Sequence, residues 1–282
     1  MRQNLPFALE ARALGTPELL RREHPELISL VTFDSARGWV RWGRVDQTLV
    51  PFLFEPQECE AWGTFEEERA LALPESLWNA PEAFSERLFG WSELLTNLGY
   101  IEHVSEECLD VLGTNQDSRE PVLLGTAPRS LFRACGLRTR AVRLVRFCEE
   151  PRSPYCLGKR SPSKRIGPGL WDNLVAGLVS AGETPETALI REAQEEASLK
   201  LTREELVPLG AFESLRMEAD GLLDEQTLLF GVKGTRRALK NTDGEVECFG
   251  LLTSEELTEA IEAGVVMNEA AWAFLVDQAL HP

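Results

Sequence analysis

The stretch that decides the fold runs from Gly177 to Leu199 and reads GLVSAGETPETALIREAQEEASL. It predicts a glycine-containing turn followed by a helix over residues 185–197. Thr184 is a good N-cap, because its hydroxyl can accept a hydrogen bond from the first helical turn. Pro185 suits the first helical position, where its missing N–H is not needed. The start of this helix is therefore set by local sequence.

Three glutamates define one face of this helix. Glu192, Glu195 and Glu196 stand at positions i, i+3 and i+4, so their side chains project from the same face. Like charges at this spacing repel by about 0.2–0.5 kcal/mol per pair. A divalent cation would remove that repulsion, and oxygen ligands suit Mg²⁺ or Mn²⁺. The alternative interpretation is a solvated acidic face. Arg191 can reach back to Glu183 and brace the turn against the helix.

Composition narrows the class of protein. The chain has 282 residues, of which 43% are hydrophobic, enough for two ordinary domains. Its three histidines and six cysteines form no zinc-binding pattern, so any metal here is expected to have oxygen ligands. The net charge of −17 argues against a general nucleic-acid binder. No apolar run is long enough for a membrane span or a secretory signal, so a cytoplasmic address is expected.

Two domains are expected along the chain. Residues 1–119 are interpreted as a smaller α+β domain, and residues 120–282 as an α/β domain in which strands and helices interleave. The polar segment 113–121 is the predicted boundary. The predicted strands are 27–33, 38–45, 138–147, 155–159, 206–213, 226–233 and 245–252, and residues 171–176 precede a glycine turn. The predicted helices are 5–22, 81–99, 185–197, 254–262 and 268–280.

The glutamate segment resembles the Nudix box, G-x5-E-x7-R-E-U-x-E-E-x-G-U, where U is an aliphatic residue. The residues at the fixed positions of the box are Gly177, Glu183, Arg191, Glu192, Glu195 and Glu196. One position departs from the pattern. Ser198 stands where the family has a glycine that ends the helix, often in the left-handed conformation. Serine fits that conformation less well, so the sequence leaves the geometry of the helix exit open.

The resemblance implies an α/β/α sandwich with a mixed sheet and a magnesium-dependent (or manganese-dependent) hydrolysis of a diphosphate linkage. It implies metal ligands at Glu192, Glu195 and Glu196, with the Gly177 carbonyl as a further candidate. Glu183 and Arg191 would be the structural brace. The expected catalytic base is a helix glutamate, Glu195 or Glu192, or a later carboxylate, Glu245 or Glu247. The alternative for the two later residues is an ordinary acid at a strand edge.

A basic segment precedes the acidic helix. Residues 151–170 contain no acidic residue, and their five basic residues are Arg152, Lys159, Arg160, Lys164 and Arg165. This cluster predicts a phosphate-binding patch beside the metal, with Arg160 and Lys164 as the individual substrate-binding candidates. The alternative is a flexible, solvated loop, since the segment is rich in turn residues.

Wider similarity narrows the subgroup. Residues 157–177 (LGKRSPSKRIGPGLWDNLVAG) resemble the approach to the box in Nudix proteins related to thiamine pyrophosphokinase, and so do residues 243–252 and the Gly38-Trp39-Val40 element. This resemblance implies hydrolysis of thiamine diphosphate, especially oxidised forms, to the monophosphate. Trp171 and Trp39 could supply an aromatic wall for the thiazolium ring. The alternative for each tryptophan is core packing.

The sequence is also compatible with two other functions. One is a nucleotide-directed Nudix pyrophosphatase acting on an oxidised dNTP, ADP-ribose or a dinucleotide. The other is a Nudix-fold binding protein without turnover. The expected partner is a small anionic diphosphate rather than nucleic acid or a membrane. The domain over residues 1–119 offers no catalytic pattern and could be a lid, an element of a homodimer or a specificity wall.

Overall fold

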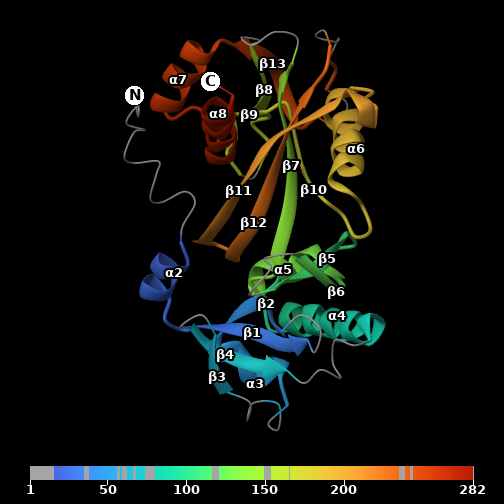
Figure 1. Ribbon diagram of the computed structural model, residues 1–282, viewed down its shortest axis with the longest axis vertical. Helices are drawn as coiled ribbons and strands as arrows, with labels where there is room; N and C mark the ends of the chain where they lie inside the picture. Colours follow the sequence, from blue (N-terminus) through green and yellow to red (C-terminus); the bar gives the residue numbers. More distant parts are fainter. Residues whose placement is uncertain are drawn as a thin grey trace. The chain divides into compact units, whose positions relative to one another are not determined.

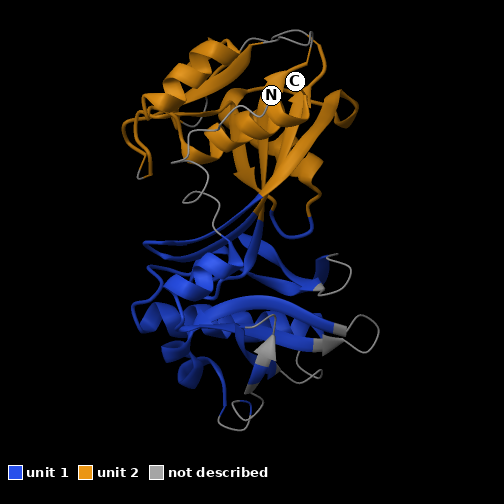
Figure 2. Ribbon diagram, turned by 60° about the vertical axis from the view of Figure 1, so that its left-hand side comes forward, with its two compact units in different colours: residues 1–139, 180–182, 213–225 blue, residues 140–179, 183–212, 226–282 orange. Residues whose placement is uncertain are grey.

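The computed structural model describes residues 16–34, 38–55, 58, 62–65, 68–73, 80–115, 121–148, 154–164, 166–234, 239–241 and 244–281. They form two compact units (Figure 2). Unit 1 comprises residues 1–139, 180–182 and 213–225, and unit 2 comprises residues 140–179, 183–212 and 226–282. The division after residue 139 differs from the expected boundary after residue 119, because residues 121–134 complete the sheet and helix layer of unit 1.

Unit 1 is built on a six-stranded mixed sheet in the order β3-β4-β1-β2-β5-β6. β1 pairs with β2 antiparallel and with β4 parallel. The strands are β1 (Leu27–Asp34), β2 (Gly38–Asp46), β3 (Trp62–Phe65), β4 (Glu68–Leu73), β5 (Cys108–Asn115) and β6 (Pro121–Pro128). The helices are α2 (Pro17–Glu23), α3 (Val50–Leu53), α4 (Pro81–Asn97) and α5 (Arg129–Ala134), with a 3₁₀ turn at Gln47–Leu49.

Helix α4 covers part of this sheet as its periodicity predicts. Phe84, Leu88, Trp91 and Leu95 are all buried, which confirms the apolar face assigned from sequence. The helix lies close to β6 at Gly125, where an added Cβ would meet Ser85 Oγ at 2.7 Å. The expected helix over residues 5–22 is described only from Pro17 onward, and residues 1–15 lie outside the described residues.

The segment over residues 113–121 is not a linker between domains. β5 and β6 pair antiparallel, from Cys108 opposite Pro128 to Thr114 opposite Pro121. The polar residues are therefore the connection of a hairpin within one sheet. Turn-rich sequence is common to hairpins and linkers, which explains why the sequence alone predicted a boundary here. Residues 116–120 lie outside the described residues.

A buried ion pair lies inside unit 1. The Arg44 side chain is 2% exposed. Its Nε donates to Glu68 Oε2 at 2.9 Å, its Nη2 to Glu68 Oε1 at 3.1 Å, and its Nη1 to Asp224 Oδ2 at 3.2 Å. Burial raises the pKa of Glu68, but hydrogen bonds and charge from Arg44, aided by Ser29, outweigh it and hold that pKa below its usual value. Arg44 therefore connects Glu68 and Asp224, which are distant from it in sequence, within the interior of unit 1.

Unit 2 contains the seven-stranded sheet, with the order β11-β12-β7-β8-β13; β10 pairs with β7, and β9 with β8. The strands are β7 (Arg138–Phe147), β8 (Tyr155–Arg160), β9 (Trp171–Asn173), β10 (Val175–Leu178), β11 (Leu206–Glu218), β12 (Gly221–Val232) and β13 (Val246–Leu252). The helices are α6 (Pro185–Ala197), α7 (Ser254–Glu262) and α8 (Asn268–Leu280), with a 3₁₀ turn at Arg203–Glu205. Each strand and helix predicted in this half is present, whereas β9 and β10 were not predicted as strands. β11 and β12 are longer than predicted, and their far ends belong to unit 1.

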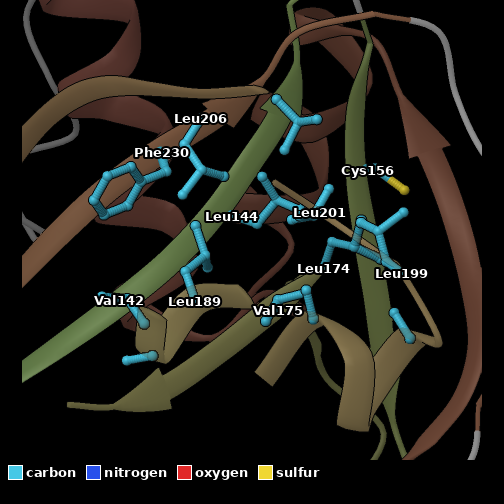
Figure 3. Close-up of a cluster of buried hydrophobic side chains, with 14 of the residues drawn as sticks. Val142, Leu144, Cys156, Leu174, Val175, Leu189, Leu199, Leu201, Leu206 and Phe230 are labelled. Carbon is cyan, nitrogen blue, oxygen red and sulfur yellow. The ribbon is translucent and has the colours of Figure 1, made fainter. Parts of the chain in front are cut away.

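Helices lie on both faces of the unit 2 sheet (Figure 1). On one face, Leu189 of α6 packs with Val142, Leu144 and Val175 of the strands (Figure 3). On the other face, Asp277 of α8 is held by the sheet through polar contacts described below. This is the α/β/α arrangement that the resemblance to the Nudix box implies. None of the helices in the described part of the chain has the length and apolarity needed to cross a bilayer.

Helix α8 is attached to the sheet by a buried carboxylate. Asp277 is 1% exposed. Its Oδ2 accepts a hydrogen bond from Tyr155 Oη at 2.8 Å and lies 2.8 Å from Arg146 Nε. Burial raises the pKa of Tyr155, so its hydroxyl stays protonated and keeps donating. A buried charge of this kind is retained only with partners, so β7, β8 and α8 are fixed together at this point.

We predict that Arg44→Met destabilises the protein by about 3–5 kcal/mol, because it leaves the Glu68 and Asp224 carboxylates without their cation inside unit 1. Urea denaturation followed by tryptophan fluorescence measures the change. The control is Arg129→Met, since Arg129 is 56% exposed in its ion pair with Glu107 and its loss should cost no more than about 1 kcal/mol. Equal effects of the two substitutions would contradict the role assigned to the buried pair.

Candidate active site

The ends of α6 are fixed by its own residues. Thr184 Oγ1 accepts a hydrogen bond from Thr187 N at 3.3 Å, and Thr187 Oγ1 accepts one from Thr184 N at 2.9 Å, which makes a reciprocal capping box. At the other end, Ser198 has φ of 52° and ψ of 27°. The helix exit is therefore left-handed although serine replaces the glycine of the box, and the question left open by the sequence is answered.

Arg191 braces the turn before the helix, as predicted. Its Nε donates to Glu183 Oε1 and its Nη2 to Glu183 Oε2, both at 2.9 Å. The Nη2 group also donates to the carbonyl of Leu178 at 3.2 Å. The hydrogen bonds that Arg191 donates to Glu183 are the largest cause of the raised pKa of Arg191. A planar guanidinium can donate to both oxygens of a carboxylate at once, so a bidentate contact joins the turn to the helix.

Gly177 allows Glu192 to lie directly over strand β10. A Cβ added to Gly177 would stand 2.1 Å from Glu192 Cδ, so the Glu192 side chain would have to move away from the strand. Glu196 contacts the same strand one residue earlier, where its Oε2 accepts a hydrogen bond from Ala176 N at 3.0 Å. Two of the three helix carboxylates are thus placed against residues 176 and 177, and the glycine is required for that closeness.

The third carboxylate faces outward. The Glu195 side chain is 55% exposed, and its Oε2 lies 3.3 Å from Arg191 Nη1, which also donates to Glu192 Oε1 at 2.8 Å. Protein donors therefore occupy these acids, and among the described residues no group of three or more His, Cys, Asp or Glu side chains is gathered closely enough to hold a metal ion. The donor set still fits a hard cation, because it consists of carboxylates and strand backbone around an unsubstituted Cα.

The basic segment is engaged with acidic partners. Lys164 Nζ pairs with Glu245, and Lys159 Nζ lies 3.1 Å from Glu247 Oε2. These contacts join β8 and the loop after it to the start of β13. The expected phosphate ligand Lys164 and the expected base Glu245 therefore neutralise each other. Their partnership was invisible in the sequence because they are 81 residues apart. Arg152 and Arg165 lie outside the described residues.

The two tryptophans differ in setting. Trp171 is half-buried and its ring covers Gly250 of β13, where an added Cβ would lie 2.9 Å from Trp171 Cη2. Its backbone is held by Val265 and Met267, so its position is well defined. Trp39 belongs to unit 1 and is 40% exposed. The structure thus gives Trp171 a packing role against β13 and leaves part of its surface accessible.

Two charged residues next to the site were not identified from sequence. Asp172 is buried and accepts hydrogen bonds from Arg143 Nη1 at 2.9 Å and Arg160 Nη1 at 3.0 Å. Arg143 lies inside β7, a strand whose other residues are apolar or basic except for Thr139. The position of Arg143 at the centre of a buried strand could have identified it as a residue of interest, because a buried charge needs a partner. Nothing in the sequence indicated Asp172 as that partner.

Comparison with known proteins supports the resemblance of residues 177–199 to the Nudix box. A family model described as the NUDIX domain matches residues 137–268. A Nudix hydrolase from Deinococcus radiodurans is 34% identical over 110 residues, which cover 39% of this chain and 60% of the relative. An isopentenyl-diphosphate Delta-isomerase from Paenarthrobacter aurescens is 29% identical over 106 residues, which cover 38% of this chain and 57% of the relative. The chain thus spans less than two thirds of the length of these relatives.

A crystal structure of a Deinococcus radiodurans protein gives a further match. It is 25% identical, has a TM-score of 0.44, and covers 59% of this chain and 97% of that chain. The second curated relative named above is an isomerase and the first a hydrolase, so their names alone do not fix one reaction.

We predict that Gly177→Ala weakens Mn²⁺ binding at least about tenfold, because the new methyl group displaces Glu192 from the strand. Titration of the purified protein with Mn²⁺, followed by electron paramagnetic resonance of the free ion, measures this. Gly90→Ala is the matched control: Gly90 is exposed in α4 with nothing within 4 Å of an added Cβ, and alanine there should stabilise the helix by about 0.5–1 kcal/mol. Unchanged Mn²⁺ affinity in Gly177→Ala would contradict the packing argument.

We predict that Ser198→Gly stabilises the protein by up to about 1 kcal/mol, since the left-handed conformation costs an L-residue roughly 1–2 kcal/mol and glycine none. Metal affinity should not change, because the helix exit is already left-handed. The midpoint of thermal unfolding and the same Mn²⁺ titration test both statements. A lower midpoint for Ser198→Gly would show that the serine makes a stabilising contact that outweighs its backbone cost.

Proposed function

We propose, from the premise that residues 137–268 are a Nudix domain, that this chain hydrolyses the phosphoanhydride bond of a small diphosphate substrate. Glu192, Glu195 and Glu196 are its proposed ligands for Mg²⁺ or Mn²⁺, with the Gly177 carbonyl as a further candidate. The observation that carries the proposal is the position of Glu192 over the bare Cα of Gly177, while Arg191 clamps Glu183. An acidic helix that served only as a solvated surface would not require that glycine.

The bound cation would supply charge neutralisation on phosphate and a lowered pKa for a water molecule. The residues of the chain supply the rest. Arg191 keeps the turn and helix in register, so that Glu192 and Glu196 stay beside β10. Glu195, the most exposed of the three, is the proposed base that accepts the proton of the attacking water. Glu245 is the weaker candidate, because its carboxylate is paired with Lys164.

For the substrate we propose thiamine diphosphate, particularly oxidised forms, hydrolysed to the monophosphate. The support is the similarity of residues 157–177 to the thiamine-related Nudix proteins and the partial exposure of Trp171. Among the relatives is an enzyme named for isopentenyl diphosphate, which is also a small diphosphate without a nucleoside. The second candidate is a nucleotide diphosphate linkage, which the Nudix hydrolase relatives leave open.

We predict that a substrate panel at fixed Mg²⁺ releases phosphate from oxothiamine diphosphate, and that Glu196→Gln lowers that rate at least about 100-fold, since it removes a charged ligand from the metal. Glu186→Gln is the control, because Glu186 lies in the first turn of the same helix and pairs with Arg203 instead. Consumption of a nucleotide alone would replace the thiamine assignment. Full activity of Glu196→Gln would remove the helix as the metal site.

A further inference from the structure

Three charged side chains of unit 2 form a continuous set of contacts across β7, β9 and β8. Arg143 Nη1 donates to Asp172 Oδ1 at 2.9 Å, and Arg160 Nη1 donates to Asp172 Oδ2 at 3.0 Å. Their side chains are 12%, 9% and 21% exposed for Arg143, Asp172 and Arg160. Two guanidinium groups thus share one carboxylate in a nearly buried setting, which leaves one net positive charge in a chain of net charge −17.

Strand pairing links this cluster to β10, the strand that the glutamates of α6 contact. In the register of β7 with β10, Arg143 is directly opposite Ala176, and residues opposite each other in an antiparallel pair have Cα atoms about 4.5–5.5 Å apart. Ala176 N is the group that donates to Glu196. One strand residue therefore contacts the acidic helix and neighbours the arginine cluster. Positive and negative groups in this order suit a substrate whose phosphate bridges a metal and an arginine.

Arg160 is held so that one edge of its guanidinium stays available. Its Nε donates to the Ile166 carbonyl at 3.0 Å and its Nη1 to Asp172. Its backbone bonds to Leu170 and Gly169 close the same loop. Its Nη2 group makes no hydrogen bond to any residue in the described part of the chain. Two of the three guanidinium nitrogens are thus used for orientation, and the third has donors to offer to an anion.

We propose that Arg143 and Asp172 are positioning residues that fix Arg160, so that its Nη2 edge receives a phosphate oxygen of the diphosphate substrate. The inference rests on the proposed function and adds a subsite to it. Asp172 supplies the fixed carboxylate that orients the guanidinium, and Arg143 keeps that carboxylate in place. Because a guanidinium binds phosphate through a planar, directed edge, its rotation would weaken binding even though the charge remains.

The test is calorimetric titration of the full-length protein with inorganic pyrophosphate at saturating Mg²⁺. Asp172→Asn and Arg143→Lys should each raise the Kd at least about tenfold, and Arg160→Gln should do the same. The matched controls are Asp277→Asn and Arg146→Lys, which alter the other buried Arg–Asp pair on the same strand β7. The controls should lower the unfolding temperature and leave the Kd unchanged.

The sign of the Asp172→Asn effect separates positioning from simple electrostatics. Removing a negative charge near an anion site would tighten pyrophosphate binding if charge alone mattered, whereas loss of orientation weakens it. Tighter or unchanged binding in Asp172→Asn overturns the proposal. If that variant fails to fold, unchanged affinity in Arg160→Gln overturns it instead. Pyrophosphate binding is measured whether or not any diphosphate is hydrolysed, so failure of the proposed function would be seen separately.

Discussion

The contact between Arg191 and Glu183 is the constraint on which the candidate site depends. This contact joins the loop before α6 to the middle of the helix. The Nη2 group of Arg191 also donates a hydrogen bond to the Leu178 carbonyl at the end of β10. Because the guanidinium is planar and both oxygens of Glu183 are used, strand, turn and helix have little freedom to slide. The position of Glu192 over Gly177 follows from that fixed relation, and so does the approach of Glu196 to Ala176.

Strand β10 separates two kinds of chemistry. The helix carboxylates contact Ala176 and Gly177 from α6, whereas Arg143 lies on the neighbouring strand β7. The chain thus places acids suited to a hard cation next to arginines suited to phosphate, although its overall charge is strongly negative. Repulsion within the acidic face is relieved locally by Arg191, which contacts Glu192 and Glu195 as well as Glu183.

Local signals explain what could be predicted from sequence, and long-range partners explain what could not. Helix α6 was predicted with its observed bounds because Thr184, Pro185 and the apolar spacing lie within it. The β5–β6 hairpin was missed because its turn resembles a linker. Lys164 and Arg160 were predicted as phosphate ligands from their charge, but Glu245 and Asp172 pair with them in the structure. A sequence shows a charge without showing what neutralises it, and strand pairing decides the partner.

The most direct measurement is an anomalous difference map from crystals soaked in Mn²⁺. The account predicts one strong peak beside β10, with carboxylate oxygens of Glu192 and Glu196 among its ligands and the Arg191–Glu183 contact intact. A map with no peak at saturating Mn²⁺, or with the ion bound only by residues away from α6, would contradict the claim that this helix and its glycine form a metal site.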